Sequence, residues 1–373
     1  MLWKIMSVAM VVCTVVAGVY YYILINRILS LFVKQIKIPW KIVIALLALI
    51  LGLLSGDLFS TIGVILVHIA AAALVMEVVN LIVKRAGKQS EKPKWNRIYK
   101  SCLIPVLITA VIFTYGYFNI RHVVEKEYTV ETEKNIRQDY RVLLVTDSHY
   151  GTIFETETLK KLKTRMDAVE ADIALLGGDI VDESTTKDEM QEIFRTFGQI
   201  KAKYGVYYIY GNHDRQRYAS SSYYTPQELE DTIRQSGITV LEDNYVSIAP
   251  GLVLAGREDA SPARKSVTDI LQGVKPEDYI IMADHQPIEY AENKKAGVDL
   301  ILSGHTHAGQ IFPSGYVMKF FHTFDLWYGH TTVDSMDAVV SAGLAGWGYP
   351  IRTQKHSEYT IINIKRKERE YYD

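Results

Sequence analysis

Two histidines one residue apart, His305 and His307, follow an apolar run in the stretch LSGHTHAGQ. Glycines stand on both sides of the pair, so bulky side chains are kept away from either imidazole. Imidazole is the commonest metal ligand among side chains, and it is also a general acid or base near neutral pH. Most histidines in Gly-rich turns, however, are polar residues at a strand end without chemistry. The choice depends on which other side chains the sequence places beside the pair.

Further apolar runs end in side chains that can bind metals. RVLLVTDSHYG delivers Asp147 and His149, ADIALLGGDIVD delivers Asp179, GVYYIYGNHD delivers Asn212, and DYIIMADHQP delivers His285. Each residue alone is explained by a helix cap, a turn or a satisfied polar tip. Together with the histidine pair they make a set that caps explain poorly, so we expect one shared site.

The chemistry of this set favours two metal ions. Carboxylate, imidazole and amide oxygen suit borderline divalent ions, and we expect Mn2+, Fe2+, Zn2+ or Co2+. The two cysteines, Cys13 and Cys102, lie in the apolar N-terminal third, so a thiolate zinc site is excluded from the rest of the chain. The ligands are too many for one ion that also holds water and substrate. Two ions that share a bridging carboxylate fit the number, and ions about 4 Å apart clamp a phosphoryl group.

The elements that must position these residues alternate between strands and helices. Amphipathic stretches over about 155–169 and 187–204 separate the first three apolar runs. In open α/β sheets, ligands bind beyond the carboxyl ends of the strands, where these polar residues fall. The pattern alone allows either a single doubly wound sheet or two stacked sheets.

The first 120 residues form a different region of the chain. Four apolar stretches, at about 5–26, 40–56, 60–83 and 102–120, are long enough to cross a bilayer. A cleaved signal peptide would explain at most the first of them. His68 and Glu77 lie within the third stretch, where we expect packing or an interhelical hydrogen bond rather than a transport site. The domains expected are a transmembrane region over 1–120, a polar linker over 121–139 and a soluble domain over 140–373.

Lysine and arginine set the expected orientation. Basic residues gather after the first stretch and after the third, whereas the turn between the second and third has only Asp57. Basic loops stay in the cytoplasm, so a multi-pass protein of the cell membrane with an extracytoplasmic soluble domain follows. The residues concerned are Arg27, Lys34, Lys37, Lys41, Lys84, Arg85, Lys88, Lys92, Lys94, Arg97 and Lys100. The net charge of −1 gives no basic field, so no nucleic acid partner is expected.

The ordered set DSH, GGDIVD, GNHD, ADHQP and GHTHAGQ resembles the calcineurin-like metallophosphoesterase superfamily. GHTHAGQ and the membrane-anchored layout are similar to a bacterial branch that includes a UDP-diacylglucosamine pyrophosphate hydrolase-like group. The motifs span about 141–313 and do not cover the membrane region. The resemblance implies an α/β fold, a four-layer α/β/β/α sandwich of two mixed sheets, here preceded by four transmembrane helices.

The resemblance also implies roles for the site residues. His213 is expected to protonate the leaving oxygen, and Asp214 to orient its imidazole. A hydroxide between the ions is expected to attack phosphorus without a covalent phosphoenzyme. One ion would be held by Asp147, His149 and His307, and the other by Asn212, His285 and His305, with Asp179 bridging.

The substrate stays open at this point. A lipid-linked or envelope phosphoester or pyrophosphate is one candidate, and a soluble nucleotide or scavenged phosphoester is the other. Two aromatic segments, 217–226 and 314–330, are either a groove for an acyl chain, base or sugar or else covered core. Arg352 is a weaker candidate for contact with phosphate. The alternative class is a membrane-anchored metal or phosphate sensor without turnover, but the presence of both His213 and Asp214 favours an enzyme.

Overall fold

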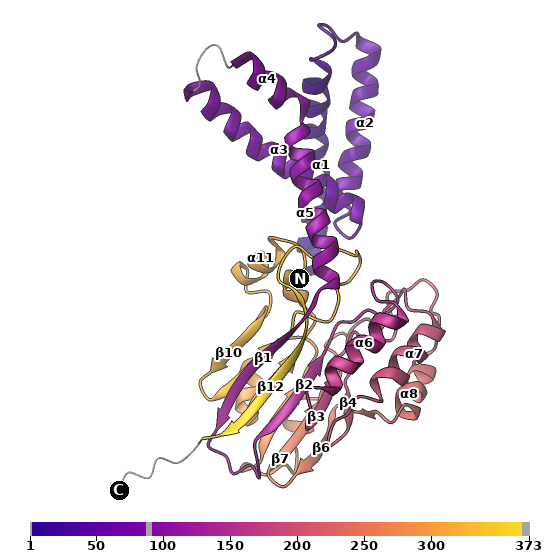
Figure 1. The fold of residues 1–373 in the computed structure, drawn as a ribbon, viewed down its shortest axis with the longest axis vertical. Helices are drawn as coiled ribbons and strands as arrows, with labels where there is room; N and C mark the ends of the chain where they lie inside the picture. The colour runs from indigo at the N-terminus through magenta and orange to yellow at the C-terminus, as the bar shows by residue number, and fades with distance from the viewer. Residues whose placement is uncertain (1, 87–91, 368–373) are drawn as a thin grey trace. The chain divides into compact units, whose positions relative to one another are not determined.

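The computed structural model describes residues 2–86 and 92–367 (Figure 1). The chain forms two compact units, Met1–Gly116 and Tyr117–Asp373. The last turn of helix α5 (Leu103–Arg121) therefore belongs to the second unit. Each unit is described by itself below.

The first unit is helical. Four of its helices are long and apolar enough to cross a membrane, and they coincide with the four predicted stretches. A further helix, α4, is polar and was not predicted. Lys88, one of the predicted basic residues, lies outside the described residues. The helices are α1 (Leu2–Leu29), α2 (Ile38–Gly56), α3 (Thr61–Ala86), α4 (Lys92–Ser101) and α5.

Helices α1 and α2 approach each other closely at a pair of glycines. A Cβ atom added to Gly52 would lie 2.7 Å from the Cα of Gly18 and 2.7 Å from the carbonyl oxygen of Thr14. Small residues of this kind let helix backbones pack in membranes, where apolar burial offers little drive for association.

Glu77 makes interhelical hydrogen bonds, as the sequence predicted. Its Oε1 atom accepts from Tyr20 at 3.0 Å and lies 2.5 Å from the Arg27 guanidinium, while Oε2 accepts from Tyr99. His68 packs its ring edge-on against Phe113, with the centroids 5.1 Å apart. His68 and Glu77 are thus both engaged by neighbouring helices.

Over residues 117–367, the second unit contains two mixed sheets of six strands each, which confirms the predicted two-sheet fold. The first sheet has the order β1-β12-β2-β3-β4-β5, and the second has the order β10-β11-β9-β8-β7-β6. The central strands β2, β3 and β4 run parallel, and so do β7, β8, β9 and β11. The strands are β1 (Val123–Thr132), β2 (Tyr140–Val145), β3 (Ile173–Leu176), β4 (Val206–Tyr208), β5 (Thr239–Val240), β6 (Asn244–Ala249), β7 (Leu252–Gly256), β8 (Tyr279–Ala283), β9 (Leu300–Ser303), β10 (Gly329–Val333), β11 (Met336–Val340) and β12 (Ser357–Arg366).

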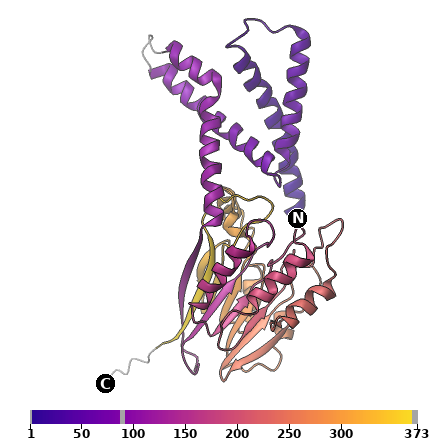
Figure 2. The ribbon, with the colours of Figure 1, turned by 45° about the vertical axis from the view of Figure 1, so that its right-hand side comes forward.

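Helices cover the outer faces of the sheets. Helices α6, α7 and α8 lie side by side over the first sheet in both views (Figures 1 and 2). The second sheet packs on the short helices α9 and α10, which complete the fourth layer. Helix α11 follows the short turn η1, beyond β9. The bounds are α6 (Thr156–Asp167), α7 (Lys187–Phe197), α8 (Pro226–Gln235), α9 (Val267–Ile270), α10 (Tyr290–Lys295), η1 (His307–Gly309) and α11 (Ser314–Phe320).

Both faces of the central strands are buried, which explains their unbroken apolar runs. In β2, Val142 and Leu144 join the core between the two sheets, whereas Leu143 and Val145 join the core under the outer helices. Side chains alternate across a strand, so a strand with two covered faces is apolar at every position. This rigid sandwich brings the carboxyl ends of its strands to one edge.

The linker predicted over 121–139 was wrong for most of its length. Residues Val123–Thr132 form the edge strand β1, which pairs in parallel with β12. Along β1, exposed residues alternate with residues that are half-buried or buried, because only one face of the strand packs against the domain. The charged residues of the segment therefore mark an edge strand, where charge prevents unwanted pairing with other chains.

Candidate metal centre

The seven predicted ligands all lie just beyond the carboxyl ends of strands. Asp147 and His149 follow β2, Asp179 follows β3 and Asn212 follows β4 in the first sheet. His285 follows β8, and the pair His305 and His307 follows β9 in the second sheet. The site therefore lies at the edge where the two sheets meet, and it takes ligands from both.

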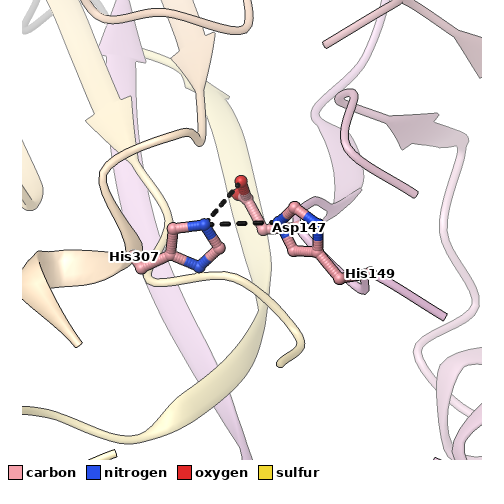
Figure 3. Close-up of side chains that lie close together, drawn as sticks. All are labelled: Asp147, His149 and His307. Atoms are coloured by element: carbon pink, nitrogen blue, oxygen red, sulfur yellow. Dashed lines mark hydrogen bonds and ion pairs between the residues drawn. The ribbon is translucent and has the colours of Figure 1, made fainter. Parts of the chain in front are cut away.

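Two groups of side chains are close enough to hold metal ions. Asp147, His149 and His307 form the first ligand group, and Asp179, His285 and His305 form the second. Within each group the ligand atoms all lie within 4.8 Å of one another. In the first group, shown in Figure 3, His307 Nε2 lies 3.3 Å from His149 Nε2 and 3.7 Å from Asp147 Oδ1.

Asp179 links the two groups through one oxygen. Its Oδ2 atom lies 3.1 Å from His285 Nε2 in the second group and 3.9 Å from His149 Nε2 in the first. Its Oδ1 atom accepts a hydrogen bond from the backbone N–H of His213 at 2.9 Å. One carboxylate oxygen is thus held by the protein, and the other faces both groups.

The orientation of His285 and Asn212 fits ligands to a metal. His285 is fully buried, and its Nδ1 donates to the carbonyl oxygen of Gly177 at 2.9 Å, so Nε2 is the ring nitrogen that faces the second ligand group. Within the described residues, neither His285 Nε2 nor the buried Asn212 Oδ1 makes a hydrogen bond. Buried polar atoms are normally hydrogen-bonded, and these two have the donor chemistry of ligands for a borderline divalent ion.

The charge state of the second ligand group suits a cation. Burial, reinforced by the charge of His285, lowers the pKa of His305 to about 4, so this imidazole is neutral and offers a lone pair. Burial raises the pKa of a carboxyl group, but the charges of His285 and His213 outweigh this effect and lower the pKa of Asp179 well below its usual range.

In the first ligand group, burial acts on both kinds of side chain. It raises the pKa of Asp147 and lowers the pKa of His307 well below its usual range, in the latter case reinforced by the charge of His149. A neutral His307 can bind an ion without first losing a proton.

Several ligands have a strained backbone. Asp147, His149, Asp179, His305 and His307 all have φ between 39° and 69°, the left-handed region that side chains other than glycine rarely adopt. Such conformations persist only where the surrounding structure enforces them, and they cluster at functional sites. The strain indicates that the fold holds these side chains for chemistry rather than for its own stability.

Two glycines are required for close approach. A Cβ atom on Gly211 would lie 2.2 Å from Asp179 Oδ1, and one on Gly304 would lie 2.3 Å from Asp147 Oδ2. Any larger residue at either position would push a carboxylate out of place.

The predicted contact between Asp214 and the His213 imidazole was wrong. The His213 Nδ1 atom lies 2.7 Å from Glu183 Oε2. Asp214 is fully buried, and its carboxylate accepts hydrogen bonds from the backbone N–H groups of Asp179, Ile180, Val181 and Gly211. Asp214 therefore shapes the loop that carries Asp179, and Glu183 is the residue that orients His213.

A second carboxylate that the sequence interpretation missed lies behind the first ligand group. Asp182 Oδ2 is 3.2 Å from His149 Nδ1, on the side of the ring away from His307. Burial opposes the charge of Asp182, but His149 lowers its pKa to about 2. Carboxylates behind metal-binding histidines fix the tautomer and the ring orientation. Both missed residues lie in GGDIVDE, directly after Asp179, where the acidic spacing was the available signal.

Aromatic rings flank His213. The ring of Tyr218 lies 5.2 Å and that of Trp347 5.0 Å from the His213 imidazole. Tyr218 is 54% exposed, whereas Tyr224 of the same segment is buried. The aromatic segment 217–226 is therefore partly core and partly a wall beside the candidate proton donor.

Arg352 does not lie free to meet a phosphate, contrary to the weaker prediction. It is fully buried, and its guanidinium donates to the carbonyl oxygens of His307, Ala342 and Ala345. Its place behind the His307 backbone gives it a structural part in holding the second sheet's ligand loop.

Comparisons with known proteins agree with this site. Residues 140–309 match the family model of calcineurin-like phosphoesterases. An uncharacterized metallophosphoesterase of Helicobacter pylori is 28% identical over 249 residues, covering 65% of this chain and 64% of its own length. A transmembrane protein with metallophosphoesterase domain of Danio rerio is 26% identical over 301 residues, covering 75% and 66%. The match thus spans just under two thirds of these relatives.

Among solved structures, a dimetal phosphatase of Danio rerio aligns over 55% of this chain and 87% of its own, with 11% identity and a TM-score of 0.33. The family match includes all seven predicted ligands, from Asp147 after β2 to His307 in the turn after β9. Residues 140–309 are thus similar to the calcineurin-like phosphoesterases, and the relatives that match over this region carry the name metallophosphoesterase.

Proposed function

We propose that the protein hydrolyses a phosphoester or pyrophosphate bond in a lipid-linked substrate, with two divalent ions at the shared Asp179. The observation that carries the two-ion proposal is the position of Asp179 Oδ2, within 3.9 Å of histidine nitrogens from both ligand groups. When bound, the two ions would supply Lewis acidity toward the phosphoryl group and lower the pKa of water. Mn2+, Fe2+, Zn2+ and Co2+ all suit the nitrogen and oxygen ligands.

The protein's own residues would then handle the leaving group. His213 lies beside the first ligand group, with its ring centroid 5.5 Å from that of His149, and its side chain is 13% exposed. Glu183 holds Nδ1, so Nε2 is the atom left to give a proton to the departing oxygen. This role is general acid catalysis, which requires reach to the substrate as well as a proton.

The lipid-linked substrate is supported by the layout of the chain. Four helices are long and apolar enough to cross a membrane, and the last of them ends one residue before β1. The resemblance of GHTHAGQ and this layout to the UDP-diacylglucosamine pyrophosphate hydrolase-like group points the same way. Basic residues on the connections after α1 and α3 favour an extracytoplasmic domain.

A substrate panel tests the proposed activity. The full chain, purified in detergent, is analysed for bound metals and assayed on soluble monoesters, diesters and pyrophosphates and on their acylated counterparts. We expect two ions per chain and the highest kcat/KM on an acylated compound. Metal-loaded protein that prefers a soluble ester would refute the lipid-linked substrate while leaving the hydrolase intact.

Reporter fusions test the orientation. A reporter joined after the C-terminus should be active outside the cytoplasm, and one inserted in α4 should be active inside. The opposite pattern would place the catalytic domain in the cytosol.

A further inference from the structure

An exposed apolar surface follows directly after the metal-binding histidines. Phe320 is 77% exposed and Phe321 is 71% exposed, and three more apolar side chains of the same segment are about half exposed. The segment 312–321 contains a single charged residue, Lys319. We call these residues the α11 surface: Phe312, Tyr316, Val317, Phe320 and Phe321. Contiguous apolar patches of this kind on a protein surface mark a site of interaction.

The segment that carries the α11 surface is fixed to one loop of the domain. The Phe312 backbone N–H donates to Thr353 Oγ1 at 2.9 Å, and the Thr353 N–H donates to the carbonyl oxygen of Gln310 at 2.8 Å. The Gln310 side chain donates to the carbonyl oxygens of Trp347, Tyr349 and Ile351. The exposed rings are thus held in place by the loop 347–356.

The same loop holds the end of α5. The Asn119 side chain, which is 4% exposed, donates to the carbonyl oxygens of Arg352 at 3.0 Å and Lys355 at 2.6 Å. Ser357 Oγ donates to the carbonyl oxygen of Ile120 at 2.8 Å. Since α5 is long and apolar enough to cross a membrane and ends at Arg121, a bilayer that α5 crosses would end near the loop 347–356.

Two exposed aromatic residues lie at this end of α5. Tyr117 is 46% exposed and Phe118 is 66% exposed, in the last turn of α5. Aromatic side chains gather at the boundary between lipid and water. Figure 1 shows α11 at the end of the second unit from which β1 starts, and the last turn of α5, which belongs to this unit, lies at the same end. The α11 surface and the end of α5 therefore lie on the same side of this domain.

From these contacts we propose that the α11 surface is a membrane-docking site, with its aromatic side chains in the interfacial layer of the bilayer that α5 crosses. Rigid aromatic rings are suited to the boundary of headgroups and acyl chains, and Lys319 can reach a lipid phosphate. His305 and His307 come shortly before the segment, and Arg352 of the same loop donates to the His307 carbonyl oxygen at 2.7 Å. Docking would hold the metal centre next to lipid headgroups, which deepens the proposed function by bringing the site to its substrate.

Depth-dependent quenching tests the docking directly. The full chain is placed in phosphatidylcholine vesicles with a fluorescent label on Phe320→Cys, and nitroxide-bearing phosphatidylcholine is added. Glu277→Cys is the matched control, because Glu277 is exposed and lies before β8, at the opposite end of its strands from the metal ligands. The unsubstituted chain gives the background from Cys13 and Cys102. Strong quenching at position 320 and none at 277 is expected.

Equal and weak quenching at both positions would overturn the proposal, and the α11 surface would then face water or a protein partner. This readout does not depend on turnover, so it stands even if no substrate is found.

A second readout connects docking to the site and rests on the proposed function. In Phe320→Ser/Phe321→Ser, the ratio of hydrolysis of an acylated phosphoester in vesicles to that of a soluble ester should fall about tenfold or more, because aromatic side chains are withdrawn from an apolar environment. An unchanged ratio together with quenching absent at position 320 would refute the docking. Loss of both activities, with quenching retained in the labelled chain, would leave docking in place and count against the hydrolase proposal.

Discussion

The two units of the chain each contain clustered charged groups, and the clusters differ in how their polar atoms are paired. In the first unit both oxygens of Glu77 are engaged by side chains of other helices, and Arg27 also donates to Cys102, with only its Nε atom left unpaired. In the second unit the buried atoms His285 Nε2 and Asn212 Oδ1 make no hydrogen bond to any residue that the structure describes.

The difference separates a structural cluster from a chemical one. A buried charge that is paired by its own protein is costly to unpair, and it has little left to offer a ligand. Lone pairs that are buried and unpaired cost stability unless something binds them. The same residue types therefore take opposite roles, and the variants below test the distinction from the largest expected effect to the smallest.

The largest effect is expected for Asp179→Asn. The variant removes the negative charge that both ligand groups share, so the affinity for both ions should fall and turnover should be lost. Metal analysis by mass spectrometry and the panel assay measure the two effects. A variant that keeps two tightly bound ions and its activity would show that Asp179 does not bridge.

A smaller and selective effect is expected for His213→Ala. A poor leaving group such as an alkoxide needs a proton, so hydrolysis of alkyl or sugar phosphoesters should fall about 100-fold or more. A nitrophenyl ester should lose less, since its leaving group departs unprotonated, and the bound metals should stay. His307→Ala is the control, because loss of a metal ligand should reduce both activities alike. Equal losses for His213→Ala would assign it to charge stabilisation instead.

Glu183→Gln should reproduce the His213 effect in weaker form. Loss of an outer partner of a site histidine costs about 10- to 100-fold, and the same preference for a good leaving group should appear. Because Glu183 acts through His213, the double variant should be no worse than His213→Ala. Additive losses would mean that Glu183 serves the site by another route.

Asp214→Asn is the matched comparison for Glu183→Gln. The Asp214 carboxylate accepts four backbone hydrogen bonds, which an amide cannot accept in full. We expect a loss of about 1–3 kcal/mol in the free energy of unfolding. The leaving-group dependence of the remaining activity should match that of the unaltered protein. A Brønsted slope that shifts as in His213→Ala would restore Asp214 as the partner of the imidazole.

The sequence could offer a candidate ligand set because every candidate is tied to a pattern of local chemistry. Asp147, Asp179 and His305 each end an apolar strand run, and the edge where parallel strands end is common to all α/β sheets. The two-sheet architecture came from the family resemblance, since strand and helix patterns alone allowed a single sheet. Six of the ligands are brought into two groups by the fold, which position along the sequence could not establish.

The sequence could not predict hydrogen-bond partners that depend on the direction in which a side chain points. Asp214 is next to His213 in sequence, yet its side chain turns toward the backbone of the Asp179 loop, while Glu183 arrives from another loop. The pairing of Arg27 with Glu77 joins residues fifty positions apart on different helices. The edge strand β1 was missed for a different reason. Its alternating charged residues are also typical of solvated linkers.

The smallest effect on catalysis is expected in the first unit, for Glu77→Gln. The substitution keeps the size of the side chain but removes the charge that faces Arg27 at 2.5 Å. Polar contacts between helices in membranes contribute about 1 kcal/mol, so the free energy of unfolding in detergent should fall by about that amount. Activity on the soluble ester should stay at the level of the unaltered chain, since the charged groups of the cluster are paired with one another.

The double variant Arg27→Met/Glu77→Gln makes this test sharper. If the cluster is a self-contained structural pair, removal of both charges should cost less than the sum of the single losses, because neither partner is left unpaired. Thermal unfolding of the four proteins in the same detergent gives this coupling energy. If Glu77→Gln instead lost metal-dependent activity at unchanged stability, the paired cluster of the first unit would have a part in the chemistry of the second, and the comparison between them would fail.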